Sequence, residues 1–597
     1  GGEAILWLQI ERVAVRACVS CCRCLHLPAS VPVLSRFLAV LFPSLCVLFL
    51  FCCSSYWCLS LSLSFSPTRT VSLGTTHFAA VQGSVCWMGG TCSGAKDADA
   101  LRKHIMEGRV PMSSDIQTEG IFYQHYFQCV PETERYFRAR FHACALENPL
   151  LAQQMEYFIG MDLCSKLDGD GLQGWGGRSN LDIVVVLDIS GSMDGTFEIL
   201  EVEQGEEEQL VSKMDAAKES LTKMLSVLTD RDRLALVTFN TQAEQLTNLT
   251  PMNEEGREVA MEAIRGLRAD GGTDMLKGMT MAAEILQSVL NENENTKRIF
   301  FFTDALISLP QVGNDPLLEF SKEVASQGIS TTYFGVGCDF DSAVVATISA
   351  CDGCNYHSIL SSAEFSRLLS EDFPYLVTIV AREVMVALDQ ERSRGVRLTQ
   401  AFSAGTNSGA EMVKVTQQVN IGHIFPTHAL KSSEGLLDIK GGMVVFGLEV
   451  DPDEEDPCAV FRVNHLSMAG ERFDETVEVP IRAAEECPKA LRVGVALARF
   501  CMVMRNIAVG VRKPADRATV LEPGYLCSVM SPPLDPSLDA SSIALNTAES
   551  QEALRFSGAM DHLTAFLAYL RREMADTGDE SLDMEASLLS HLISVVP

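Results

Sequence analysis

The sequence predicts an α/β domain with a doubly wound parallel sheet over residues 181–373, followed by an antiparallel β domain and C-terminal helices. Two observations support this fold class. From Leu181 onward, short apolar runs rich in β-branched residues alternate with segments of helical spacing, which is typical of parallel strands covered by helices on both faces. After Phe373-Pro374, strand-like runs follow one another without helices between them, as in antiparallel sheets.

The elements of the α/β domain are predicted in the following order. Asp182–Asp188 is a near-continuous apolar run, as expected of a strand buried on both faces. Further strands are predicted at Arg233–Phe239, Arg298–Thr303 and Ile329–Val336, and helices at Ser212–Leu228, Glu254–Leu267, Asp274–Leu290, Pro316–Ser326, Ser342–Ser349 and Ala363–Ser370. This alternation favours a doubly wound sheet.

The regions before and after this domain have different sequence patterns. Residues 112–180 mix short apolar runs with polar turns and are predicted to be a lead-in and linker. The β domain is expected over 374–485, with strands at Val377–Leu388, Val396–Phe402, Met412–Ile424, Gly442–Val450, Cys458–Asn464 and Phe473–Ile481. A helical C-terminal region is expected over 486–597, with helices at Pro488–Ile507, Glu549–Glu573 and Leu582–Val595 and a Pro-rich loop at Glu522–Asp539.

Residues 1–95 differ in composition from the rest of the 597-residue chain. They contain two acidic and five basic residues and half of the 20 cysteines, and residues 37–68 carry no charge. Three interpretations are open: a membrane anchor at Phe37–Cys53, a signal peptide flanked by Arg36, or a segment foreign to the natural protein, which would then begin near Met112. We expect a cytoplasmic protein in the last case, and a membrane-anchored or extracellular-facing one if the segment is genuine.

Composition excludes one class of function. The 78 acidic residues outnumber the 47 basic residues and give a formal charge of −31. Such a surface repels polyanions, which excludes a nucleic-acid-binding protein that relies on net charge. Ten cysteines spread over 112–597 are too sparse for a disulfide scaffold and are typical of buried thiols.

A turn rich in oxygen side chains follows the first buried strand. In Asp188-Ile189-Ser190-Gly191-Ser192, three such side chains occupy alternate positions, and Gly191 lets the backbone turn closely. Ligands of open α/β sheets lie beyond the carboxyl ends of the strands, so a site is expected here. Oxygen ligands without His or Cys favour a hard cation, namely Mg²⁺, Mn²⁺ or Ca²⁺. Taken alone, the pattern also fits a hydrogen-bonded strand-to-helix turn.

Two further segments extend this pattern to that of a known family. Gly271-Gly272-Thr273-Asp274 opens a predicted helix, and Phe301-Phe302-Thr303-Asp304 ends a predicted strand. Together with the serine turn they resemble the metal-ion-dependent adhesion site (MIDAS) of the von Willebrand factor type A domain, a Rossmann-like fold, and the resemblance covers about Leu181–Phe373. It implies that Ser190, Ser192 and Thr273 bind the cation through hydroxyls, while Asp188 and Asp304 bind largely through water.

The resemblance also implies a function. In this family an acidic side chain of a partner can complete the metal's ligand shell, so we expect a protein-binding, adhesion-type module without catalytic residues. Two carboxylates and three neutral oxygens leave the coordination of a divalent cation incomplete, which agrees with this mechanism. Two alternatives are an accessory subunit of a larger machine, of the chelatase or channel type, and a metal-assisted hydrolase with a loop glutamate as base.

The layout beyond this domain is similar to that of bacterial type A proteins named calcium-activated chloride channel homologues. This similarity does not predict ion conduction, because residues 374–597 contain no uncharged stretch of membrane-spanning length. A membrane role would therefore depend on residues 37–68.

Two other features have more than one interpretation. The loop 194–209 contains seven acidic residues, which could repel acidic partners, supply a carboxylate to the metal from within the chain, or form a solvated loop. Its acids are Asp194, Glu198, Glu201, Glu203, Glu206, Glu207 and Glu208. Cys338, Cys351, Cys354 and His357 have zinc-ligand types, although they also fit an ordinary helix-to-strand turn.

Overall fold

The computed structural model describes residues 99–595 with several gaps. The gaps are 113–114, 133, 152, 175–177, 198–210, 305–315, 338–353, 360, 404–415, 432–434, 468–469, 483–486, 512–547, 551–553 and 555–558. Residues 1–95, the helix predicted at Ser342–Ser349 and the loop predicted at Glu522–Asp539 lie outside the described residues.

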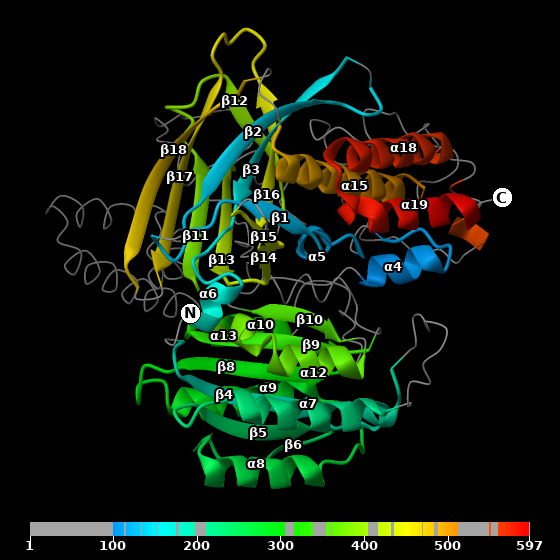
Figure 1. The fold of residues 1–597 in the computed structure, drawn as a ribbon. Helices are drawn as coiled ribbons and strands as arrows, with labels where there is room; N and C mark the ends of the chain where they lie inside the picture. The colour runs from blue at the N-terminus through cyan, green and yellow to red at the C-terminus, as the bar shows by residue number, and fades with distance from the viewer. Residues whose placement is uncertain are drawn as a thin grey trace, which may run out of the picture. The chain divides into compact units, whose positions relative to one another are not determined.

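A seven-stranded sheet forms the centre of the α/β domain (Figure 1). Its order is β10-β9-β8-β4-β5-β6, with β7 paired to β5. The strands are β4 Leu181–Asp188, β5 Arg233–Phe239, β6 Ala243–Gln245, β7 Thr250–Pro251, β8 Thr296–Thr303, β9 Ile329–Val336 and β10 Asn355–Ile359. β10, β9, β8, β4 and β5 pair in parallel, whereas β6 and β7 run antiparallel to β5. The predicted parallel sheet is confirmed.

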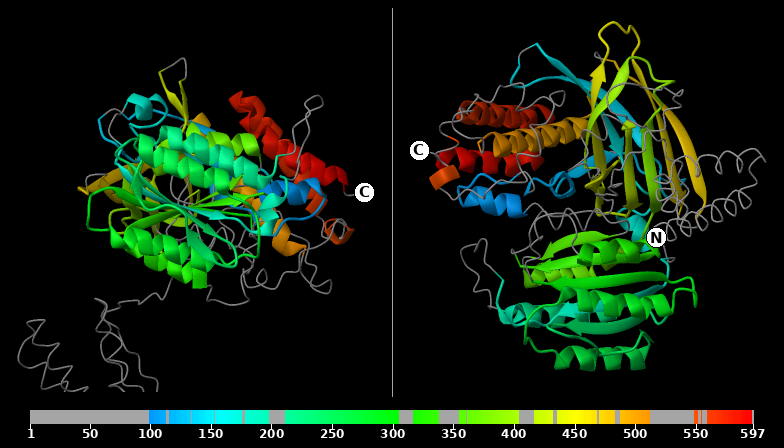
Figure 2. Two further views of the ribbon diagram at one scale, coloured as in Figure 1. Left: turned by 90° about the horizontal axis from the view of Figure 1, so that it is seen from below. Right: turned by 180° about the vertical axis from the view of Figure 1, so that it is seen from behind.

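Helices cover both faces of this sheet, as the left view of Figure 2 shows. Ile183 and Val185 of β4 pack with α7 and α12, whereas Val184 and Val186 point to the opposite face and pack with α9 and α10. The helices are α7 Lys213–Val227, α8 Glu254–Gly266, α9 Met275–Ser288, α10 Pro316–Ser326, α12 Ser362–Ser370 and α13 Phe373–Val377. The doubly wound arrangement is therefore confirmed, and it explains why the side chains of β4 are apolar on both faces of the sheet.

The antiparallel β domain consists of two four-stranded sheets packed face to face. One has the order β13-β11-β17-β18 and the other β12-β16-β3-β2. The strands are β2 Arg140–Glu147, β3 Met155–Asp162, β11 Ala381–Leu388, β12 Val396–Phe402, β13 Gln418–Ile424, β16 Met443–Val450, β17 Cys458–Ser467 and β18 Arg472–Pro480. One hydrophobic core joins them, with Val384 and Phe461 from the first sheet against Ile159 and Phe446 from the second. A three-stranded sheet, β1 Tyr126–Cys129, β15 Leu437–Lys440 and β14 Ala429–Lys431, completes the β structure.

Residues 112–180 are not a lead-in and linker, because they supply strands to this domain. β3 pairs with β16 on one side and with β2 on the other, and β1 pairs with β15. The alternation that would reveal β3 is obscured by Glu156, which is buried against Arg499, and by Gly160. A side chain at Gly160 would meet Leu491, since its Cβ would lie 2.8 Å from Leu491 Cδ1. The β domain is thus assembled from sequence segments that precede and follow the α/β domain.

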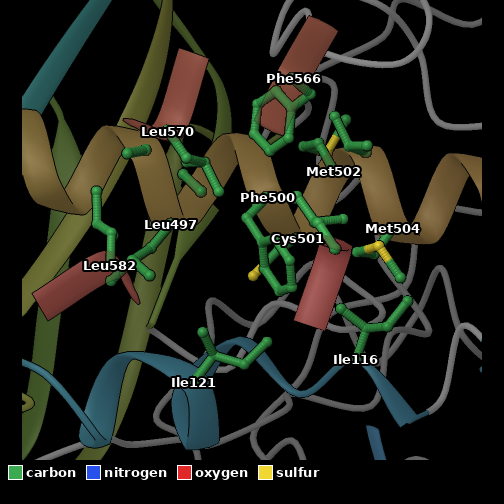
Figure 3. Packing of buried hydrophobic residues seen from close by; sticks show 14 of the residues in the cluster. Ile116, Ile121, Leu497, Phe500, Cys501, Met502, Met504, Phe566, Leu570 and Leu582 are labelled. Atoms are coloured by element: carbon green, nitrogen blue, oxygen red, sulfur yellow. The ribbon is translucent and has the colours of Figure 1, made fainter. Parts of the chain in front are cut away.

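The C-terminal helices pack around one central helix, α15 Lys489–Gly510, as Figure 3 shows. Phe500 and Leu497 of α15 share a hydrophobic core with Phe566 of α18 Ala559–Thr577 and with Leu589 of α19 Asp583–Val595. α4 Asp99–Met106 and α5 Thr118–Tyr123 contribute to the same core. The C-terminal helices predicted from the sequence are confirmed.

In the described part of the chain, α15 alone has the length and composition of a membrane span. It has 22 residues, and its most apolar stretch has a mean hydropathy of 1.5, but 89% of that stretch is buried inside the protein.

The buried carboxyl group of Asp168 makes the stability of the β domain depend on pH. Asp168 precedes the short helix α6 Asp170–Gly174, and its oxygens accept hydrogen bonds from Ser165 N at 2.6 Å and Thr427 N at 2.9 Å. Burial raises the pKa of Asp168 from 3.8 to about 7. Because the folded pKa is the higher one, the stabilising contribution of this group is complete below about pH 4 and is lost as the pH rises through about 7.

Asp168→Asn is expected to flatten the dependence of the unfolding free energy on pH between about 4 and about 7, because the neutral amide does not titrate. Urea unfolding of both proteins at several pH values in this window measures the slope. Asp170→Asn is the control, since Asp170 is exposed and pairs with Lys431 at the surface. Equal dependence of the unfolding free energy on pH in wild type and Asp168→Asn would contradict a raised pKa of Asp168 in the folded protein.

Candidate metal centre

Asp188 and Asp304 lie at the carboxyl ends of adjacent parallel strands. Asp188 ends β4 and Asp304 directly follows β8, and in the register of these strands Leu187 lies beside Phe302. Thr303 therefore lies beside Asp188 and donates from Oγ1 to Asp188 Oδ2 over 2.6 Å. The backbone N–H of Ser190 donates to the other oxygen, Asp188 Oδ1, over 2.8 Å. Both carboxylates are buried, and the sheet fixes their separation.

The two serines of the turn connect these carboxylates. Ser190 Oγ lies 3.0 Å from Ser192 Oγ, and Ser192 Oγ donates to Asp304 Oδ1 over 2.7 Å. Ser190 is buried and precedes the short 3-10 helix η3 Gly191–Asp194, whereas Ser192 is exposed. The four side chains form one hydrogen-bonded cluster that reaches solvent at Ser192.

Thr273 lies on a loop that packs against the serine turn. Gly191 N donates to the Gly271 carbonyl over 3.1 Å, and Asp270 N donates to the Ile189 carbonyl over 2.7 Å. Gly271 has a φ of 86°, and a Cβ at this position would lie 3.0 Å from Asn240 Nδ2, so both conformation and space favour glycine. Thr273 is exposed and stands before Asp274, the N-cap of α9. Backbone contacts thus hold Gly271, two residues before Thr273, against the serine turn.

Lys213, the first residue of α7, also contacts this cluster. Its Nζ donates to Asp304 Oδ2 over 3.1 Å, and the two side chains are 10% and 0% exposed. Lys213 is held there because its backbone N–H donates to the Gly195 carbonyl over 2.8 Å, next to a bridge between Thr196 and Ser212. The acidic loop therefore leaves and rejoins the domain at one point, immediately beside the cluster.

The chemistry of the cluster fits a divalent cation. Burial raises the pKa of Asp188, and repulsion by the nearby Asp304 carboxylate adds to this effect, while hydrogen bonds from Ser190 and Thr303 oppose it. A cation between the two carboxylates would stabilise the buried charge of Asp188 and offset its repulsion by Asp304. The donors are carboxylate and hydroxyl oxygens, which suit Mg²⁺, Mn²⁺ and Ca²⁺.

Residues 183–306, which include the strands from β4 to β8, the serine turn and both carboxylates, match the family model of the von Willebrand factor type A domain. This chain contains a type A domain. Its serine turn, Thr273 and Asp304 follow the order of the MIDAS motif. Domains of this type commonly mediate metal-dependent interactions between proteins.

Relatives of known name are similar to parts of the chain. Inter-alpha-trypsin inhibitor heavy chain H4 of Homo sapiens is 27% identical over 177 residues, which are 29% of this chain and 17% of that protein. The voltage-dependent calcium channel subunit alpha-2/delta-2 of Homo sapiens is 30% identical over 134 residues, 22% of this chain and 10% of that protein. The matches thus span less than a fifth of these relatives.

A solved structure of a von Willebrand factor type A protein from Catenulispora acidiphila is also similar. It is 16% identical with a TM-score of 0.40, and the alignment covers 64% of this chain and 87% of that one.

The two other predicted features lie partly outside the described residues. Of the zinc-type side chains, Cys338 and Cys351 are outside, while Cys354 and His357 are buried at β10, where His357 stacks on Phe334. Within the described ranges, no three His, Cys, Asp or Glu side chains form a group that could bind a metal ion. The glutamates of the acidic loop are outside, and Asp194 is exposed on η3.

Sequence reasoning missed Thr303 and Lys213 as members of the cluster. Thr303 could have been found, because it precedes Asp304 at the end of a predicted strand. Lys213 gives no local signal, since its contact with Asp304 joins residues 91 positions apart.

Proposed function

We propose that the type A domain binds a divalent cation, Mg²⁺ or in its place Mn²⁺ or Ca²⁺, and through it a carboxylate of a protein partner. The ligands are Asp188, Ser190, Ser192, Thr273 and Asp304. The domain acts as a binding module and not as an enzyme.

The observation that supports this proposal most strongly is the hydrogen-bonded cluster of two carboxylates and two serines. Asp188 and Asp304 are fixed by adjacent strands. In the turn that connects them, Ser190 Oγ lies 3.0 Å from Ser192 Oγ, and Ser192 Oγ lies 2.7 Å from Asp304 Oδ1. A bound cation would replace hydrogen bonds that the cluster now makes internally, so little rearrangement is needed. Ser192 and Thr273 are both exposed, so a partner has access to these two side chains.

Charge favours an anionic group on the partner. Asp188 and Asp304 neutralise a divalent cation, and the buried ammonium of Lys213 then leaves the loaded site with one net positive charge. A carboxylate would balance this charge while filling an open coordination position, which is a charge-assisted contact. A neutral amide of the same shape would supply the oxygen without the charge.

The same site also serves a second candidate function, in which the chain is an accessory subunit docked on a larger assembly. This candidate is supported by a relative that is named as a calcium channel subunit. Both relatives compared above are named for an inhibitor chain and a channel subunit, which favours binding over catalysis.

Calorimetric titration of Mg²⁺, Mn²⁺ and Ca²⁺ into the full chain tests the metal site. We expect saturable binding at one site in the wild type and its loss in Asp188→Ala and in Ser190→Ala. Ser326→Ala is the matched control, because Ser326 is an exposed serine of α10 whose hydroxyl donates to the Glu323 carbonyl of the same helix. Absence of binding in the wild type would refute the proposal while leaving the fold unchanged.

A peptide array tests the partner's carboxylate separately. Peptides containing Asp or Glu and their Asn or Gln counterparts are probed with the full chain, in Mg²⁺ and in chelator. We expect capture by acidic peptides in Mg²⁺ alone. Two results, obtained alongside metal binding in the calorimeter, would refute the bridging step. One is equal capture by the acidic peptides and their Asn or Gln counterparts, and the other is capture that persists in chelator.

A further inference from the structure

Arg298 is a fully buried arginine on β8, where it is 0% exposed. Its Nη1 donates to Thr332 Oγ1 on β9 over 3.2 Å and to the Leu376 carbonyl of α13 over 2.6 Å. The ring of Phe425, the residue after β13, lies over the guanidinium with its centre 5.3 Å from Arg298 Cζ. One nitrogen and one face of the guanidinium are therefore occupied.

The Nε and Nη2 atoms of Arg298 form the opposite edge of the guanidinium. Both atoms are buried, and neither has a hydrogen-bond acceptor in the part of the chain that the structure describes. Nε–H and one Nη2–H point in parallel, which is the arrangement in which arginine binds an anion through two hydrogen bonds. Leaving buried donors of a charged group unpaired is unfavourable, so this edge favours an acceptor that comes from outside the chain.

Asn355 adds a further unpaired donor close to this edge. It is the first residue of β10, and in the register of β9 and β10 it lies beside Thr332. Paired residues of adjacent strands project to the same face of a sheet, so the Asn355 amide and the Arg298 guanidinium both flank the Thr332 side chain. Asn355 is 0% exposed, and its Nδ2 and Oδ1 have no hydrogen-bond partner among the described residues.

The acceptors of Arg298 do not balance its charge. Thr332 Oγ1 and the Leu376 carbonyl are both neutral. Burial lowers the pKa of Arg298 to about 10, which leaves the guanidinium charged at neutral pH. The charge of a Cys354 thiolate would favour the charged guanidinium, but Cys354 belongs to the hydrophobic core on the opposite face of the sheet. A buried cation is stable when a counterion contacts it, so an anion suits this position better than water.

We propose that Arg298 and Asn355 bind one small inorganic anion, such as chloride, inside the type A domain. The anion accepts hydrogen bonds from Nε and Nη2 of Arg298 and from Nδ2 of Asn355, and it balances the buried positive charge. This site is separate from the metal centre, because Arg298 is the third residue of β8 whereas Asp304 follows the carboxyl end of that strand. The donors come together only when β8, β9 and β10 are paired, so the anion stabilises the folded chain.

Urea unfolding of the full chain tests this stabilisation at constant ionic strength, with chloride replacing gluconate, an anion too large for a buried site. Chelator is present throughout, so that the metal centre does not contribute. We expect the folding equilibrium constant to rise tenfold for each tenfold rise in chloride above its dissociation constant. Arg298→Met should abolish this dependence. Arg257→Met is the matched control and should keep it, because Arg257 of α8 donates to the carbonyls of Leu225 and Leu228.

Crystals of the wild-type chain grown in sodium bromide locate the anion directly, and they remain informative if Arg298→Met does not fold. We expect an anomalous bromine peak within hydrogen-bonding reach of Arg298 Nη2 and Asn355 Nδ2. Three outcomes would overturn the proposal. The first is a wild-type stability that does not change with chloride, the second is the wild-type dependence on chloride in Arg298→Met, and the third is bromide crystals without a bromine peak at Arg298.

Discussion

Replacing Arg499 with methionine should lower the free energy of unfolding by about 3–5 kcal/mol. Arg499 and Glu156 are each 1% exposed, and the guanidinium donates to Glu156 Oε2 from Nε at 3.2 Å and from Nη2 at 2.8 Å. Nη1 also donates to Tyr569 Oη over 3.1 Å, so the residue joins α15, β3 and α18. The variant would leave a buried carboxylate without its cation, which is the costly way to break such a pair. Urea or thermal unfolding measures the loss.

Two further variants separate this explanation from a simple loss of packing. The double variant Arg499→Met with Glu156→Leu removes both charges and should recover much of the stability, because no unpaired charge remains. Arg397→Met is the matched control, since Arg397 and Glu449 form an exposed pair between adjacent strands and such pairs contribute about 0–1 kcal/mol. A double variant as unstable as the single one would contradict the role of the buried charge.

Replacing Lys213 with methionine should strengthen divalent cation binding at least about tenfold. Lys213 Nζ lies 3.1 Å from Asp304 Oδ2 and competes with a cation for that carboxylate. Unit charges about 5 Å apart interact by about 1 kcal/mol even in water, and the repulsion doubles for a divalent ion. Removal of the ammonium lowers this repulsion and frees one carboxylate oxygen. Calorimetric titration of Mg²⁺ measures the change.

The expected gain is specific to the position of this lysine. Lys218→Met on the same helix is the control, because Lys218 lies near Asp215, at the surface of α7. Lys213→Arg should restore weak binding by returning the charge. Weaker binding in Lys213→Met would show that the ammonium orders Asp304 instead of competing for it.

The elements of the type A domain could be predicted because its strands are buried on both faces. β5, β9 and α10 have the bounds that the sequence predicts, and Ser212 is the N-cap of α7, where it accepts from Asp215 N. β10 was missed because Asn355–Ile359 is short and includes polar residues. β11 begins at Ala381, four residues later than predicted, since Val377 is the last residue of the short helix α13.

The β domain could be predicted only in part, because its strands come from two separate stretches of sequence. Strands after residue 374 are predicted as successive strand-like runs without helices between them, whereas β2 is half-exposed along most of its length and β3 includes the buried Glu156. At the metal centre, the sequence places Asp188 and Asp304 at strand ends, but only the fold shows that Ser192 contacts Asp304. A contact across 112 positions has no local signal.

The way in which the type A domain is attached has a mechanical consequence. The chain enters it after β3 and leaves it before β11, and these strands belong to opposite sheets of the β domain. Each is an interior strand, with β3 between β16 and β2 and β11 between β13 and β17. A pull exerted by a bound partner would therefore be divided between two sheets. It would load hydrogen bonds on both sides of each strand in shear, and no edge strand would be peeled away first.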